Sequence, residues 1–150
     1  QKIAFAESDA DPAALAMNHY TAAAWAEAKS PGIAASRFAA WLKPFCTTKK
    51  KSKAGNDYFV ARLAGYNAAA FDAPRLRQLF GPQFLPAEYP VRDVLQQAVF
   101  YFDEHPTVTP PSNMKLATVC AHFGISIDGA HDALADARMC AELHHKLTLV

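Results

Sequence analysis

The clearest periodic pattern of apolar positions lies near the C-terminal end of the sequence. From Ala133 onward the chain is rich in strong helix formers, and its apolar residues recur at steps of three and four, which predicts a helix with one buried face. Asp132 is the expected N-cap, and Asp136 falls in the first turn, where unpaired amides favour a carboxylate. Five residues turn an ideal helix by about 140°. His131 can therefore meet Asp136 only if His131 lies on the loop before the helix.

Shorter patterns, together with capping residues, Pro and Gly, predict further helices. Thr21 is the expected cap of one of them, Pro74 lies near the first turn of another, and Gly81 and Gly124 mark helix ends. The expected helices span residues 13–19, 22–29, 33–43, 73–80, about 95–104, and 114–123 with Ser112 or Asn113 as cap.

The strongest strand signal covers residues 57–66, which are rich in aromatic and branched side chains. We expect one buried strand there, ending close to Asp72, and shorter strands at 2–6 and 91–94. Residues 49–53 contain four lysines and no periodicity, so they are expected to form an exposed loop. Alternating strands and helices favour an α/β fold, and we expect a single domain over residues 1–150.

Composition narrows the class of protein. A hydrophobic content of 51% with 19% charged residues is typical of a folded domain, and the net charge of +1 gives no global field for a polyanion. Any nucleic-acid role must therefore rest on local features. The three cysteines are expected to be reduced and mostly buried. We expect a cytoplasmic protein, because no apolar run reaches the ~20 residues of a membrane span and no leader pattern opens the chain.

Asp72, Asp136 and His131 together suit metal-assisted phosphoryl chemistry. Mg²⁺ and Mn²⁺ prefer carboxylate oxygens, and a pair of such ions can hold the attacking and leaving oxygens of a phosphodiester. A neutral imidazole is the natural base for the attacking water, because its pKa lies near working pH. We therefore interpret the two aspartates as candidate metal ligands and His131 as a candidate general base.

These residues also resemble a known family. Residues 65–76, GYNAAAFDAPRL, are similar to the second motif of the DEDDh 3′-to-5′ exonucleases, which include the proofreading subunit of bacterial replicative polymerase, and residues 131–137, HDALADA, resemble the third. The resemblance implies a ribonuclease-H-like mixed sheet flanked by helices, two Mg²⁺ or Mn²⁺ ions, and release of nucleoside monophosphates from the 3′ end of DNA or RNA, expected to be single-stranded. It also implies a role in DNA repair or replication.

The resemblance assigns roles residue by residue. Asp72 and Asp136 would be the metal-site carboxylates and His131 the general base. Asn67, Tyr66, Phe71 and Pro74 would form the substrate side of the second motif, with Tyr66 standing where many members have His.

The first motif of the family, an apolar strand ending in Asp-x-Glu, does not occur in this sequence. We therefore expect the chain to begin downstream of that strand and to be inactive or nearly so by itself. The alternative is a truncated or decayed module that binds nucleic acid or a partner protein without catalysis. Two further possibilities stay open: another polypeptide supplies the missing strand, or Gln1 is an artificial boundary of the sequence. The oligomeric state is also open.

Three features have a second interpretation. The lysines of 49–53 form either a solvated loop or a contact to a phosphate backbone. The aromatic residues 100–102 are expected in the core, although one ring at the rim would suit a base. Asp93 either holds the edge of the sheet together or takes part in the chemistry.

Overall fold

The computed structural model describes residues 2–17, 19–130 and 132–149. His131, the predicted general base, lies outside these residues. The chain forms two compact units, each built from two separate segments. Unit 1 contains Gln1–Ala61 and Leu76–Pro86, and unit 2 contains Arg62–Arg75 and Ala87–Val150.

In unit 1 the helix capped by Thr21 begins where it was expected, whereas the helices expected from residues 13 and 33 begin earlier, at Pro12 and Pro31. In sequence order the helices of its first segment are the 3-10 turn η1 (Glu7–Asp9), α1 (Pro12–Met17), α2 (Ala22–Trp25), α3 (Pro31–Leu42) and the 3-10 turn η2 (Lys43–Phe45). The Thr21 hydroxyl caps α2 by accepting the Ala24 amide at 3.1 Å. The predicted strand at 2–6 was wrong, because only a single bridge between Ile3 and Lys29 forms there.

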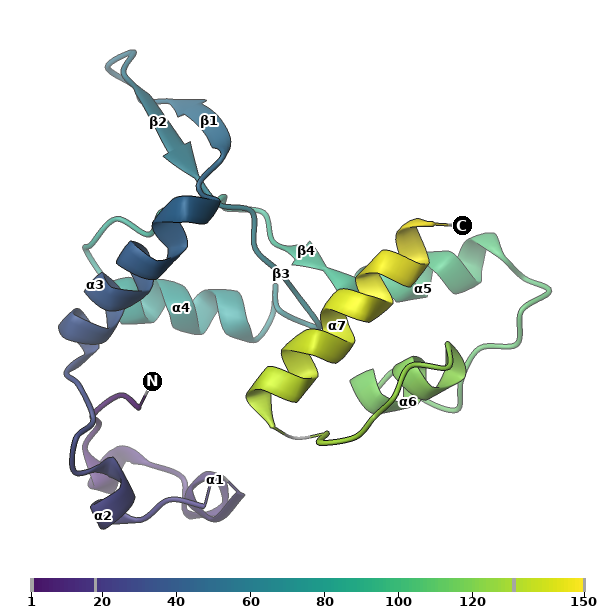
Figure 1. Ribbon diagram of the computed structural model, residues 1–150, viewed down its shortest axis with the longest axis horizontal. Coiled ribbons are helices and arrows are strands. Elements are labelled where there is room, and N and C mark those ends of the chain that lie inside the picture. Colours follow the sequence, from purple (N-terminus) through teal and green to yellow (C-terminus); the bar gives the residue numbers. More distant parts are fainter. Residues whose placement is uncertain (1, 18, 131, 150) are drawn as a thin grey trace. The chain divides into compact units, whose positions relative to one another are not determined.

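A β-hairpin in unit 1 corrects the prediction of a lysine loop. β1 (Thr48–Lys51) pairs antiparallel with β2 (Asp57–Val60), and Figure 1 shows the hairpin extending beyond the end of α3. Gly55 has a φ of +82°, and the Ser52 amide donates to the Asn56 carbonyl at 2.8 Å, which closes the turn. Lysine is uncommon in strands, so the lysine cluster gave no indication that residues 48–51 form a strand.

The expected strand at 57–66 is divided between the units. β2 ends at Val60, and the Ala61 amide donates instead to the Pro86 carbonyl at 2.9 Å. In unit 2, β3 (Ala64–Gly65) pairs in parallel with β4 (Arg92–Asp93). The antiparallel and parallel pairings thus form two separate two-stranded sheets.

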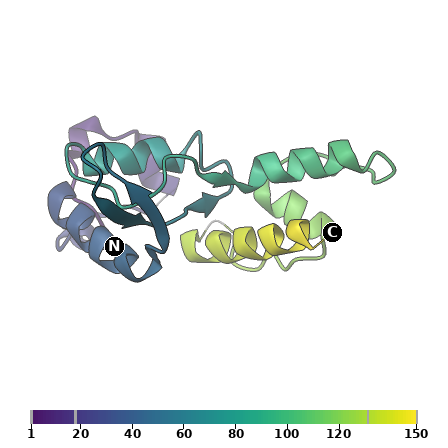
Figure 2. The same ribbon diagram turned by 90° about the horizontal axis from the view of Figure 1, so that it is seen from above.

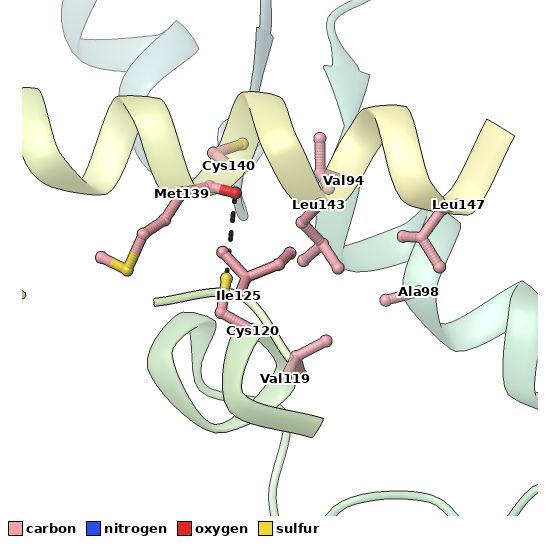
Figure 3. Close-up of a cluster of buried hydrophobic side chains, with 9 residues drawn as sticks. All are labelled: Val94, Ala98, Val119, Cys120, Ile125, Met139, Cys140, Leu143 and Leu147. Atoms are coloured by element: carbon pink, nitrogen blue, oxygen red, sulfur yellow. Dashed lines mark hydrogen bonds between the residues drawn. The ribbon is translucent and has the colours of Figure 1, made fainter. Parts of the chain in front are cut away.

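Unit 2 is organised around α7 (Ala133–Thr148), which contacts α5 (Val94–Glu104), α6 (Leu116–His122) and β3. Figure 2 shows α7 running alongside α5. Their shared core includes Val94, Val119, Cys120 and Leu143, all without exposed surface, and the Cys120 thiol donates to the Met139 carbonyl at 3.8 Å (Figure 3). The last helix therefore has a buried face, as predicted, and it contains the expected Cys140, Leu143 and Leu147. Leu134, Ala137 and Ala141, which were expected on that face, are exposed.

Several further predictions can be compared with the structure. α4 (Asp72–Phe80) and α6 end as expected at glycines with positive φ, +53° for Gly81 and +66° for Gly124. The three cysteines are free, and Cys120 and Cys140 are buried. The α/β class is confirmed. In the described part of the chain, every helix is too short or too polar to cross a membrane.

Candidate active site

The loop that leads from β3 to α4 is held by the carboxylate of Asp93. Its Oδ1 accepts the amide of Asn67 at 2.9 Å, and its Oδ2 accepts the amide of Ala69 at 3.0 Å. Oδ1 also accepts the Leu95 amide at 3.1 Å and so caps α5. Asn67 has a φ of +55°, an uncommon conformation that these bonds hold in place. Asp93 therefore has the first of its two proposed roles, holding the sheet edge and the second motif together.

Gly65 and Tyr66 fit this loop tightly into unit 2. A Cβ on Gly65 would lie 2.7 Å from the Cβ of Ala68, so only glycine allows the turn its present shape. The Tyr66 hydroxyl donates to the Met114 carbonyl at 2.7 Å, and burial raises the pKa of Tyr66 to about 12. Tyr66 thus anchors the loop, while its predicted contact with substrate stays a prediction.

Asp72 opens α4 directly after this loop. The Phe71 amide donates to the Asn67 carbonyl at 3.0 Å, and the Ala73 amide to the Ala68 carbonyl at 2.8 Å, which sets the start of the helix. Asp72 and Pro74 are both exposed in the first turn. A carboxylate there benefits from the positive end of the helix dipole.

Phe71 presents an exposed ring beside a cation. Its side chain is 53% exposed, and the guanidinium of Arg75 lies 3.6 Å from the ring centroid. Arg75 also donates to the Phe71 carbonyl at 2.8 Å. An exposed aromatic ring and a guanidinium next to Asp72 suit a base and a phosphate of a bound strand.

Asp136 lies in the first turn of α7, partly buried. Asp132 is the N-cap, as expected, with its Oδ1 accepting the amides of Leu134 and Ala135 at 3.0 and 3.1 Å. The Asp136 amide donates to the Asp132 carbonyl at 2.8 Å. Gly129, with φ +76°, turns the chain before the helix and lies so close to Ala135 that a Cβ would be 3.3 Å from that side chain.

Two buried thiols of the core of unit 2 have raised pKa values. Burial raises the pKa of Cys140 to about 11, and Cys120, Asp93 and Asp72 add to the effect. Burial likewise raises the pKa of Cys120 to about 11, with further contributions from Glu142 and Asp136. Both thiols therefore stay protonated at neutral pH.

The described residues provide the right chemistry for a hard cation but too few ligands for two. Residues 2–17, 19–130 and 132–149 contain no group of three or more His, Cys, Asp or Glu side chains arranged to hold a metal. Mg²⁺ binds through oxygen and requires near-octahedral coordination. Asp72 and Asp136 alone therefore do not make a two-ion site.

Comparison with known families now decides the relationship. One family, described as Exonuclease, matches residues 6–144. The chain belongs to this exonuclease family. Membership confirms the resemblance found in the second and third motifs and implies a ribonuclease-H-like fold and a nuclease acting on nucleic acid. No curated protein matches the sequence. No solved structure matches it either.

Asp93 both caps α5 and holds the loop after β3, and the sequence contains a signal for only the first of these roles. An aspartate before an apolar helical segment is an N-cap signal, and the bond to Leu95 could have been predicted from it, although we did not do so. The bonds to Asn67 and Ala69 join residues 26 and 24 positions away, and no local pattern encodes them.

Proposed function

We propose that this chain supplies the second and third motifs of a 3′-to-5′ exonuclease site. Asp72 and Asp136 are its acidic residues and His131 its general base. The observation that supports this most directly is the family match, which spans both motifs in their expected order.

In this proposal the chain contributes the general base, two acidic residues and residues that contact the substrate. His131 takes the proton of the water that attacks the terminal phosphodiester, and the products are a nucleoside monophosphate and a shortened strand. Phe71 offers its exposed ring to the terminal base, and Asn67, Pro74 and Tyr66 contribute to the substrate side of the same motif. Because two carboxylates are too few for two Mg²⁺ or Mn²⁺ ions, hydrolysis requires an Asp-x-Glu strand that the 150 residues do not contain.

The test compares the chain with a longer form that carries an Asp-x-Glu strand ahead of it. We expect the longer form, with Mg²⁺ or Mn²⁺, to release mononucleotides from an oligonucleotide labelled at its 3′ end. Replacing the base, His131→Ala, should lower the rate at least ~10²-fold. Asp103→Asn, an exposed change on α5 that removes one negative charge, is the control and should leave the rate unchanged. Full activity after His131→Ala would contradict the assignment.

The missing motif favours a second candidate function, a module that binds nucleic acid or a partner protein without catalysis. Titration of the chain with Mn²⁺ separates the two cases. If the site is incomplete as we propose, the chain alone binds Mn²⁺ weakly and its affinity increases sharply once the Asp-x-Glu strand is present. A decayed module would bind weakly in both forms, and tight binding of two ions by the chain alone would contradict the requirement for Asp-x-Glu.

A further inference from the structure

The β1–β2 hairpin concentrates positive charge in a chain that is nearly neutral. It has four lysines, at positions 49, 50, 51 and 53, against one acidic residue, Asp57, while the whole chain has a net charge of +1. All four lysines are exposed. The hairpin is therefore a local electrostatic feature of the kind that attracts a polyanion.

The register of the hairpin places a lysine opposite an aromatic ring on each of its two faces. Lys50 pairs with Tyr58 and Lys49 with Phe59. Residues directly opposite each other in an antiparallel pair point to the same face, with Cβ atoms about 5 Å apart. Tyr58 is 36% exposed and Phe59 52%, so both rings are accessible beside their lysines.

A third ring extends one of these faces. Phe84, which follows α4, lies with its centroid 5.8 Å from that of Tyr58 in an edge-to-face arrangement and is 64% exposed. Tyr58 and Phe84 are two walls of an open hollow of about 430 Å³, whose other lining residues are Ser52, Asn56 and Asp57. The hollow combines exposed ring faces with hydrogen-bonding groups, which suits a heterocyclic base.

The charge of the hairpin is only partly neutralised. Lys49 pairs with Asp57 at 2.7 Å, with both side chains largely exposed. Within the described ranges, Lys51 and Lys53 form no ion pair with an acidic side chain. Exposed ion pairs are weak, so a phosphate can compete for Lys49 as well.

We propose that the β1–β2 hairpin and Phe84 form a binding surface for single-stranded nucleic acid, separate from the residues of the active site. Lysines beside aromatic rings match a strand in which phosphates and bases alternate, whereas a membrane surface would favour a continuous apolar face. The ligand class rests on the proposed function. The surface itself lies in unit 1, whereas Asp72 and Asp136 lie in unit 2.

The experiment measures binding of the full chain to a labelled oligothymidylate by fluorescence anisotropy. EDTA is present, so that binding is measured without hydrolysis. The logarithm of affinity should fall linearly with the logarithm of salt concentration, and Lys51→Ala plus Lys53→Ala should reduce that slope by about 0.7 for each lysine that contacts a phosphate. Lys43→Ala, which removes an exposed lysine of the same unit outside the hairpin, is the matched control and should leave the slope unchanged.

The contribution of the rings is tested with a ligand that lacks bases. Phe84→Ala should weaken oligothymidylate binding at least about fivefold, Phe84→Tyr should restore it, and neither should change binding of inorganic polyphosphate. Three results would overturn the proposal. Lys43→Ala could reduce the salt slope as much as the hairpin variant does, or Phe84→Ala could weaken binding of oligothymidylate and of polyphosphate equally. The chain could also bind phosphatidylserine vesicles but not oligothymidylate. Because no step depends on catalysis, an inactive nuclease would leave this result standing, and loss of the hairpin surface would not refute the exonuclease site.

Discussion

Asp93 joins two segments that lie far apart in the sequence, and its replacement should loosen both. Asp93→Ala removes the cap of α5 and leaves the amides of Asn67 and Ala69 without their acceptor, so we expect a loss of at least about 2 kcal/mol in the free energy of unfolding. Asp93→Asn retains one acceptor oxygen and should lose less. Urea denaturation measures the series, and equal stability of Asp93→Ala and the parent chain would contradict the structural role.

The two buried thiols predict how stability depends on pH. The pKa values of Cys120 and Cys140 rise from 9.0 to about 11 on folding. Below pH 9 both states are protonated, so these thiols add no pH dependence. Above it the unfolded chain ionises first, and stability should fall by about 1.4 kcal/mol per pH unit for each thiol until about pH 11.

Thermal or urea unfolding at pH 8, 9 and 10 checks this prediction. Replacing both thiols, by Cys120→Ala and Cys140→Ala, should lower stability at every pH but make the decline above pH 9 shallower. A decline of unchanged steepness in the double variant would show that other groups cause it.

At the scale of elements, the turn after β3 offers a matched pair of substitutions. Gly65→Ala brings a new Cβ within 2.7 Å of Ala68, and the crowding should cost about 1–3 kcal/mol in the free energy of unfolding. Ala68→Gly removes the opposing Cβ, so the combination should recover part of that loss. A double-mutant cycle measures the coupling, and strictly additive effects would contradict the contact.

Elements that begin and end at local signals could be predicted from the sequence. Thr21, Asp132, Gly81 and Gly124 act at the ends of their helices as expected. The β1 strand could not be predicted from local signals, because lysine has a low strand propensity and the strand depends on pairing with β2. Likewise, the break after Val60 depends on a bond to Pro86, which is distant in sequence.

At the scale of the molecule, the motifs predicted the exonuclease family. Asp72 and Asp136 were chosen because their residue types and spacing resemble the motifs of the family. The match over residues 6–144 confirms the family, and the roles of the two aspartates stay a proposal. The division into two units was not predicted. Each unit combines two separate segments, so neither can be removed as one continuous piece, and the single domain over 1–150 stays a prediction.

The central claim is that Asp72 and Asp136 act at one site. It is tested most directly by exonuclease rates of the Asp72→Asn, Asp136→Asn and doubly substituted forms of the longer protein that contains Asp-x-Glu. Residues that act as a unit are strongly non-additive. We predict that each single substitution lowers the rate at least ~10²-fold and that the double variant is about as slow as the slower single one. Independent losses that multiply in the double variant, or an unchanged rate in either single variant, would contradict the claim.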